Sequence, residues 1–186
     1  SLVGDVFGRY ISGISGDYLF HSVPYYSMSE EDLELEEFNK LGEQASQGCV
    51  RLAVSDAKWV YDNCPTGTNV SIYDDAENAG PLGKPDAIKI TDFTNKWDPT
   101  DSNKKCPYAK ATPIISGAND YTIKSGGEFY ALAGVTAVDT CGNDITSNIE
   151  VFGNVVTTRK GKYKVTYSVT DVLKRTSSVT ITVTVQ

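Results

Sequence analysis

The sequence contains no apolar stretch of the roughly 18 to 20 residues that a membrane-spanning helix needs, so we expect no transmembrane segment in it. Its start also lacks a basic segment followed by a short apolar one, which is the pattern of a secretory signal. If the protein is exported, its signal is therefore expected upstream of Ser1. Histidine is scarce as well. Any imidazole-based mechanism must use His21, because it is the single histidine in the chain.

Basic residues are fewer than acidic ones. The sequence has 17 Lys and Arg against 24 Asp and Glu, which gives a net charge of −7 and a pI near 4.7. An acidic protein does not release the counterions of a nucleic acid, so we expect no DNA or RNA partner. The hydrophobic content of 40% is enough for a packed core and excludes a wholly disordered chain.

The cysteine pattern does not suit a metal. The sequence has no C-x-x-C motif and no second histidine, so it predicts no zinc site, and it indicates no cofactor. Four cysteines allow three complete disulfide pairings, and their spacing alone does not choose among them. They are Cys49, Cys64, Cys106 and Cys141.

The N-terminal part combines short strands with short helices. Residues 18–21 read as a strand that carries His21 at its end. Ser29 is a suitable N-cap for a helix through the acidic residues 30–38, since acidic side chains favour a helix N-terminus. This acidic segment is either a substrate-facing lid or, as is more usual for a run of charge, a solvated helix face.

A second helix is expected to open at Ser55, to bury Trp59 and Val60, and to end at Pro65. Residues 70–73 alternate apolar and polar side chains, which predicts a strand. Together these elements indicate a first domain over residues 1–75.

Residues 76–112 are rich in Pro and Gly and indicate an extended connector, whose apolar residues are expected to pack on one of the two domains. In residues 113–186 the segments 162–169 and 178–185 have an apolar side chain at every second position, which is typical of strands. This pattern predicts a small β-sandwich that acts as a binding or spacer module. The fold class expected for the whole chain is mainly β with short helices. The apolar residues of the connector are Ile88, Ile90, Phe93 and Trp97.

The residues best suited to chemistry stand 28 positions after His21, in the segment 46–52. Gly48 allows a tight turn in which neighbouring N–H groups can converge on an oxyanion. The thiol of Cys49 is a nucleophile that His21 could deprotonate. Arg51 supplies a fixed positive charge that could hold a thiolate or a substrate carboxylate.

These segments resemble the catalytic core of the L,D-transpeptidase (YkuD-type) family. The family has a histidine on a strand, followed by a serine-x-glycine-cysteine turn with an arginine or asparagine two residues beyond the cysteine. The resemblance covers about residues 1–75. It is carried by Leu19-Phe20-His21-Ser22-Val23-Pro24-Tyr25, Leu41-Gly42, Ser46-Gln47-Gly48-Cys49-Val50-Arg51-Leu52, Asp56-Ala57, Trp59-Val60-Tyr61-Asp62-Asn63 and Gly67-Thr68-Asn69-Val70.

The resemblance implies a mixed β core and a role for each of these residues. Cys49 would be the acyl-accepting thiolate, and His21 the general base and acid, with its ring oriented by the main chain of Ser22. The N–H groups of Gly48 and Cys49 would form part of the oxyanion hole. Arg51, with Ser46 and Gln47, would contact the donor peptide.

The implied reaction is acyl transfer on peptidoglycan stem peptides. Release of the terminal D-alanine from a tetrapeptide would lead to a 3→3 cross-link, and transfer to water would give L,D-carboxypeptidase activity. Carbapenems are the covalent inhibitors that such a thiolate implies.

The sequence departs from the family pattern at two places. Many members have a histidine just before the glycine of the turn, whereas this chain has Gln47, which cannot titrate. Family domains also have several strands before the catalytic histidine, and only 20 residues precede His21. The catalytic domain is therefore expected to be N-terminally incomplete in this chain, and such a fragment could be inactive.

The segments 139–146 and 161–171 resemble bacterial immunoglobulin-like domains of cell-surface proteins, which implies an extracellular location at the wall or surface of a bacterium. Since a nucleophilic Cys49 must stay reduced, we expect a disulfide between Cys106 and Cys141, with Cys64 a thiol.

Two other functions compete with the transpeptidase. One is a surface adhesion or wall-binding protein with an inert catalytic domain, which Gln47 and the missing strands favour. The other is a cysteine endopeptidase that acts on wall peptides with the same Cys–His pair.

Overall fold

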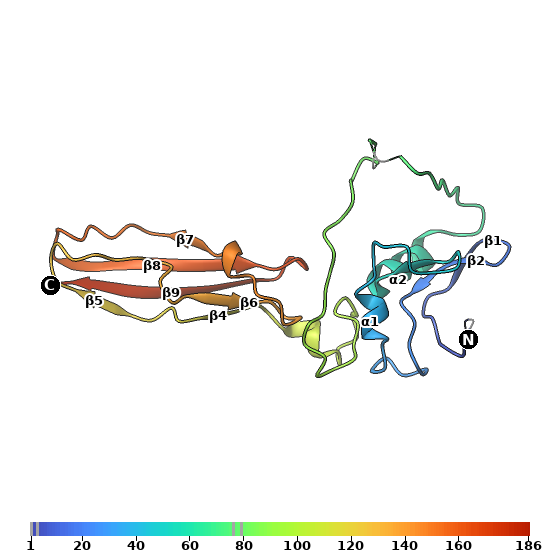
Figure 1. The fold of residues 1–186 in the computed structure, drawn as a ribbon, viewed down its shortest axis with the longest axis horizontal. Coiled ribbons are helices and arrows are strands. Elements are labelled where there is room, and N and C mark those ends of the chain that lie inside the picture. The colour runs from blue at the N-terminus through green and yellow to red at the C-terminus, as the bar shows by residue number, and fades with distance from the viewer. Residues whose placement is uncertain (1, 3, 76, 79) are drawn as a thin grey trace. The chain divides into compact units, whose positions relative to one another are not determined.

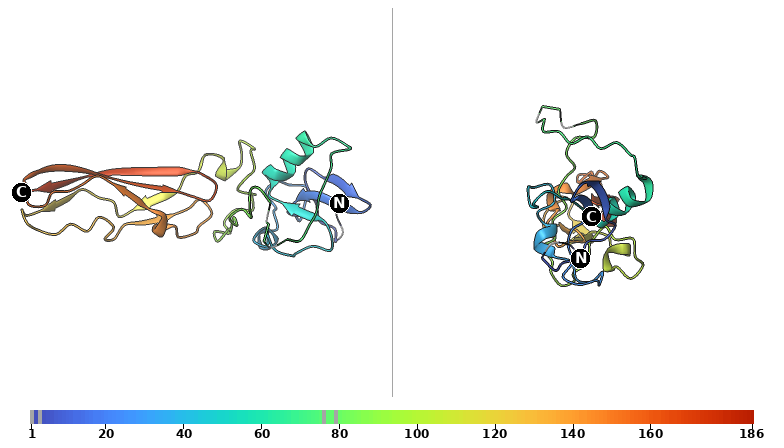
Figure 2. Two further views of the ribbon diagram at one scale, coloured as in Figure 1. Left: turned by 90° about the horizontal axis from the view of Figure 1, so that it is seen from above. Right: turned by 90° about the vertical axis from the view of Figure 1, so that its right-hand side faces the viewer.

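The chain forms two compact units, residues 1–110 and 111–186, in a computed structural model that describes residues 2, 4–75, 77–78 and 80–186 (Figure 1). Strands are more extensive than helices, and the second unit is built almost wholly from strands (Figures 1 and 2). The predicted fold class, mainly β with short helices, is confirmed.

The first unit is organised around a three-stranded sheet in the order β1-β2-β3. β1 (Ser12–Ser15) and β2 (Tyr18–Ser22) form an antiparallel hairpin, and β3 (Val50–Leu52) pairs with β2 in parallel. Two helices, α1 (Leu35–Phe38) and α2 (Val54–Asn63), accompany the sheet. The predicted strand at 18–21 is thus present and extends one residue further, to Ser22.

Three local predictions for this unit are wrong. α1 begins at Leu35 rather than at Ser29, whose hydroxyl accepts the Glu31 N–H in a turn. Trp59 is 62% exposed, because Val54 and Ala57 form the buried face of α2. Residues 70–73 form no strand, and their apolar side chains are exposed, since no described strand pairs with them.

The segment expected to be a connector belongs to the first unit. Ile90 and Trp97 are buried in it, whereas Phe93 is exposed. The Asn39 amide is bonded to Ile90 twice, with the Asn39 Nδ2 donating to the Ile90 carbonyl at 2.8 Å and the Ile90 N–H donating to Asn39 Oδ1 at 2.7 Å. An irregular segment is thereby fixed beside the end of α1.

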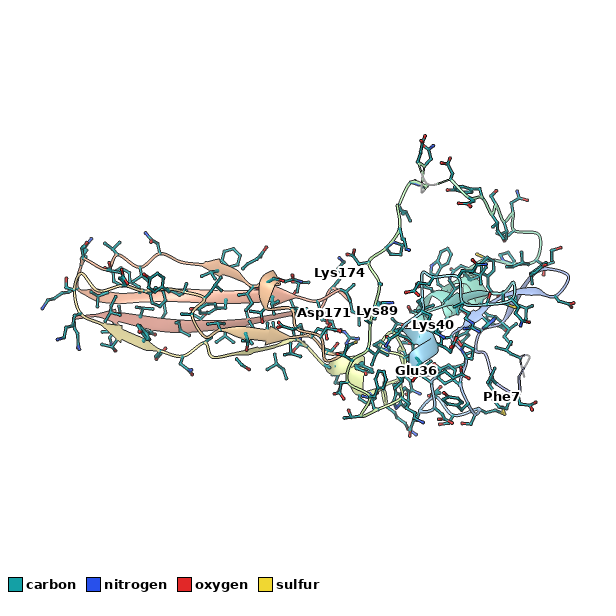
Figure 3. The ribbon with its side chains drawn as sticks, in the orientation of Figure 1. Phe7, Glu36, Lys40, Lys89, Asp171 and Lys174 are labelled. Carbon is teal, nitrogen blue, oxygen red and sulfur yellow. The ribbon has the colours of Figure 1, made fainter. Side chains whose placement is uncertain are left out.

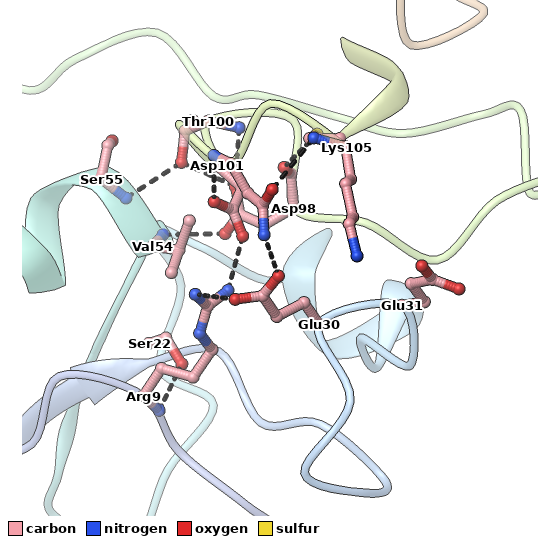
Figure 4. A network of polar contacts seen from close by, with 12 residues as sticks. Arg9, Ser22, Glu30, Glu31, Val54, Ser55, Asp98, Thr100, Asp101 and Lys105 are labelled. Carbon is pink, nitrogen blue, oxygen red and sulfur yellow. Dashed lines mark hydrogen bonds and ion pairs between the residues drawn. The ribbon is translucent and has the colours of Figure 1, made fainter. Parts of the chain in front are cut away.

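The same segment caps α2, as Figure 4 shows. The N-cap residue of α2 is Ala53, which has no side chain that can accept a hydrogen bond. Asp98 Oδ2 instead accepts the Val54 N–H at 2.8 Å, and Thr100 Oγ1 accepts the Ser55 N–H at 3.1 Å. Asp98 therefore satisfies a donor that the helix itself leaves without a partner.

The second unit consists of two sheets. One is the antiparallel pair β4 (Ile114–Ser116) and β6 (Thr136–Val138), and the other has the order β5-β9-β8-β7. The long strands β8 (Gly161–Thr170) and β9 (Thr176–Val185) pair along their whole length, and β5 (Tyr121–Ile123) and β7 (Glu150–Phe152) flank them. Two single-turn 3-10 helices, η1 (Pro107–Lys110) in the first unit and η2 (Thr146–Asn148) in the second, complete the elements.

The core of the second unit follows the predicted alternation. Every second residue of β8 and β9 faces inward, which buries an apolar row from each strand, while Thr and Ser occupy the outer face. The buried set is Val135, Ala137, Ile149, Val165, Tyr167, Val169, Ile181 and Val183.

Candidate active site

The parallel pairing of β2 with β3 brings the predicted catalytic residues together. His21 is the register partner of Arg51, so their side chains point to the same face of the sheet. Cys49 lies in the turn directly before β3, two residues before Arg51.

A cavity of about 1110 Å³ opens on this face. His21, Cys49 and Arg51 line it, and so do the other predicted substrate-contacting residues, Ser46 and Gln47. The hairpin turn at Gly16 and Asp17 also contributes to the wall. Apart from Ser22, which acts through its main chain, the structure thus brings every predicted catalytic and substrate-binding residue to one cavity.

The imidazole of His21 is held in one tautomer. The side chain is 3% exposed, and Nδ1 lies 2.6 Å from the Ser22 carbonyl oxygen. A carbonyl can only accept, so Nδ1 carries the proton and Nε2 keeps its lone pair. Burial lowers the pKa of His21, the Ser22 carbonyl opposes that change, and the positive charge of Arg51 lowers the pKa further. His21 is therefore a neutral base at neutral pH.

Ser22 is fixed by Arg9, in the irregular segment that precedes β1, a contact that sequence reasoning missed. The Ser22 N–H donates to the Arg9 carbonyl at 3.0 Å, and the Arg9 N–H donates to Ser22 Oγ at 2.9 Å. The Arg9 guanidinium in turn binds Asp101 at 2.5 Å and Glu30 at 2.9 Å (Figure 4). The carbonyl that orients His21 is therefore anchored to a polar network, which no local pattern in the sequence marks.

The Cys49 turn is built around Ser46 and Gly48. The Ser46 hydroxyl donates to the Cys49 carbonyl at 2.5 Å and accepts the Gly48 N–H at 3.2 Å. The Cys49 thiol lies 3.9 Å from the Asp17 carbonyl oxygen. In this state the Gly48 N–H is engaged by Ser46, and the long distance of that contact makes it a weak hydrogen bond.

Gly48 is required by two features of this turn. Its φ is +143°, and a Cβ at this position would lie 2.3 Å from Cε1 of Tyr18, whose ring lines the cavity. We expect Gly48→Ala to slow acylation of Cys49 about tenfold to a hundredfold, since a backbone strain of about 1–3 kcal/mol would distort the turn. Rates of alkylation by iodoacetamide and acylation by a β-lactam would measure this.

Gly13→Ala is the matched control for that variant. Gly13 lies on β1 with open space around it and an ordinary φ, so the same chemical change should leave the rate within about twofold. Equal rates for the two variants would contradict the proposed need for glycine at position 48.

Arg51 is already paired in the structure. Its Nη1 forms an ion pair with Glu37 of α1, and Glu37 also binds Lys40 at 2.5 Å. Hydrogen bonds from Lys40 and Arg51, of which that from Lys40 is the larger cause, lower the pKa of Glu37. Glu37 lies in the acidic segment that was read as a lid or a solvated face. Its contact with Arg51 belongs to neither description, and sequence reasoning missed it.

The structure has Cys106 and Cys141 as thiols in different units, and the disulfide predicted between them stays a prediction. Cys106 is buried in the first unit, with its Sγ 3.7 Å from the Asp98 carbonyl oxygen, and Cys141 is buried in the second. Burial raises the pKa of both thiols, that of Cys141 to about 11. Each thus behaves as a small core residue of its own unit. Cys64 is a half-buried thiol.

Within the described part of the chain, no group of three or more His, Cys, Asp or Glu side chains is arranged to hold a metal ion. None of the helices formed by residues 2, 4–75, 77–78 and 80–186 has the length and apolar character needed to cross a bilayer.

Comparison with known proteins finds a matching family model within each unit. Residues 6–72 match the family model described as the L,D-transpeptidase catalytic domain, and residues 113–185 match that of the bacterial surface protein Ig-like domain. The Bacillus subtilis (strain 168) protein named "Putative L,D-transpeptidase YciB" is 49% identical over 57 residues, which are 31% of this chain. The chain spans 28% of the length of that relative.

Two solved structures are similar to part of the chain. One contains the CBM51-2 domain in complex with GlcNAc and INT domains of Clostridium perfringens ZmpB. It is 31% identical, covers 40% of this chain and 16% of that one, and has a TM-score of 0.36. The other is the lipoprotein BT2262 of Bacteroides thetaiotaomicron, 22% identical over 39% of this chain and 37% of that one, with a TM-score of 0.33.

Proposed function

We propose that the chain transfers acyl groups between peptidoglycan stem peptides through Cys49, on the premise that residues 6–72 match the L,D-transpeptidase catalytic domain model and residues 113–185 the bacterial surface Ig-like model. The observation that carries the proposal is the single cavity that His21, Cys49 and Arg51 all line, with His21 and Arg51 as register partners on β2 and β3. The hydrogen bond from Nδ1 to the Ser22 carbonyl adds to it, because it leaves Nε2 ready to accept a proton.

In the first half-reaction, His21 Nε2 takes the proton of the Cys49 thiol, and the sulfur attacks the carbonyl carbon after the third stem residue. The carbonyl becomes an oxyanion, for which the Cys49 N–H, and the Gly48 N–H once released from Ser46, are the nearest main-chain donors. When the oxyanion collapses, the C–N bond breaks, and His21 returns the proton to the leaving D-alanine amine. The product is a thioester on Cys49.

In the second half-reaction, an amine of a neighbouring stem attacks the thioester carbonyl, and His21 accepts the proton that the amine loses. The C–S bond then breaks, the proton returns to the sulfur, and a 3→3 amide cross-link leaves the enzyme. Water in place of the amine yields a free carboxylate, which is L,D-carboxypeptidase activity. Endopeptidase activity requires the same steps with a wall cross-link as the donor.

The second unit supports a location at the cell envelope, because its family is that of bacterial surface proteins. We propose that the protein is extracellular, at the cell wall or cell surface, where stem peptides are available to the cavity.

Intact-mass measurement with a carbapenem tests the proposal. The thiolate should open the β-lactam amide and retain the molecule as a thioester, so the protein should gain the mass of one carbapenem. Cys49→Ala should gain nothing. Cys64→Ala is the matched control, since Cys64 is also a partly exposed thiol, and this variant should be acylated like the unchanged chain.

Incubation with a tetrapeptide stem then distinguishes the activities. Release of D-alanine with a cross-linked product supports the transpeptidase, a tripeptide alone supports the carboxypeptidase, and cleavage of purified cross-linked wall supports the endopeptidase. A chain that gains no carbapenem mass and binds purified wall would instead be the inert wall-binding protein.

A further inference from the structure

Glu37 is the acidic residue that contacts the proposed site directly. It lies on α1, next to the buried Phe38, so the packing of this short helix holds it in position. Its carboxylate binds Nη1 of Arg51 on β3 and Nζ of Lys40. The side chains of Glu37 and Arg51 are 24% and 22% exposed, which partly shields the pair from water.

The pairing decides which donors of Arg51 remain for a ligand. Glu37 occupies Nη1, and Nε is buried with no hydrogen-bond partner among the described residues. A guanidinium has five N–H donors in a rigid fork, so fixing one end sets the direction of the other. Since Arg51 lines the cavity and Nε is buried, the donors left for a peptide are those of Nη2 and the second N–H of Nη1.

The charges around this pair are few. Glu34 lies near both partners. Its pKa is raised mainly by burial and also by Glu37, and lowered by Arg51 and Lys40. On the sheet side, Arg51 neighbours His21, and the cavity wall also holds Cys49 and Asp17. Glu37 therefore balances the positive charge that stands beside the imidazole.

We propose that Glu37 is a positioning residue that holds the Arg51 guanidinium so that its remaining N–H donors bind a carboxylate of the donor peptide. This inference rests on the proposed function for its substrate, and on the Glu37–Arg51–His21 geometry for everything else. It assigns to the acidic segment a role in donor recognition rather than that of a solvated helix face.

The test compares Glu37→Gln with Glu36→Gln, which removes the same charge from the exposed neighbour on the same helix (Figure 3). We expect Glu37→Gln to raise KM for a tetrapeptide donor about tenfold with kcat within about twofold, because a charge-assisted contact is misdirected. KM for a donor amidated at its terminal carboxylate should not change. Glu36→Gln should match the unchanged chain, and Glu37→Asp should recover part of the loss.

A second readout needs no turnover. The pKa of His21, followed by NMR of its ring, should fall in Glu37→Gln because Arg51 is no longer balanced, and it should not change in Glu36→Gln. The double variant Glu34→Gln/Glu37→Gln removes the second carboxylate that could replace the lost partner.

The outcomes separate the two ideas. If the chain shows no turnover but the pKa of His21 falls in Glu37→Gln and not in Glu36→Gln, the transpeptidase proposal is contradicted. The contact of Glu37 with Arg51 is then still supported. If the chain is active, a KM that rises equally for the carboxylate and amide donors overturns the inference. An unchanged His21 titration in both Glu37→Gln and the double variant Glu34→Gln/Glu37→Gln also overturns it, with or without activity.

Discussion

Replacement of His21 with glutamine is expected to slow acylation of Cys49 about 10²- to 10⁴-fold, which is the usual contribution of a general base. Glutamine fills similar space and can still donate to the Ser22 carbonyl, but it cannot accept and return a proton. The fold should therefore survive while the chemistry fails. The rate of adduct formation with a carbapenem, followed by intact mass, measures the loss.

The pH profile provides the control for this prediction. His21 works as a base only when neutral, and burial lowers its pKa below the ordinary value of 6.5. The rate for the unchanged chain should thus be flat at neutral pH and fall only as the pH drops through that lowered pKa. His21→Gln should lack this step, and its rate should rise with hydroxide concentration. A step of the same size in both proteins would show that another group is the base.

The sequence predicted best those features that have a local pattern. The buried apolar residues of β8 and β9 were predicted from the strict alternation in residues 162–169 and 178–185. A shift of the pairing by one residue would expose all of them, so the alternation fixes which face is buried. The site was predicted from the residues around His21 and Cys49. Their order and spacing resemble those of a family, whereas the composition of the chain does not indicate a site. The structure then places both residues on the wall of one cavity.

The missed features depend on single contacts between distant segments. Residues 77–78 and 80–110 have no periodic pattern, so nothing in their sequence shows that Asn39 and Asp98 bind them into the first unit. Val70 and Ile72 have strand-like alternation, but a strand needs a partner, and none of the described strands pairs with them. In both places a contact with a distant segment, or the lack of one, determined the structure more than the local sequence pattern did.

Among these contacts between distant segments, the hydrogen bond from the Val54 N–H to Asp98 is expected to have the largest effect on stability. Asp98→Ala removes the acceptor of the Val54 and Thr100 N–H groups in a site that is fully buried. We expect the free energy of unfolding of the first unit to fall by about 3 kcal/mol at pH 7, from a lost helix cap and buried donors left without partners. Urea unfolding followed by tryptophan fluorescence isolates this unit, because Trp59 and Trp97 both lie in it.

The same carboxyl group makes stability depend on pH with a defined sign. Burial raises the pKa of Asp98 to about 6, so between about pH 4 and pH 6 the folded chain keeps a proton that the unfolded chain has lost. Unfolding then releases a proton, and the free energy of unfolding falls as the pH rises through this window, by about 3 kcal/mol at most. Asp98→Asn and Asp98→Ala should both lose that slope. Asp56→Asn, on the exposed side of the same helix turn, should keep it. Equal slopes in all four proteins would show that another group is the source of this pH dependence, whereas the loss of stability in Asp98→Ala at pH 7 tests the cap that Asp98 provides for the helix after β3.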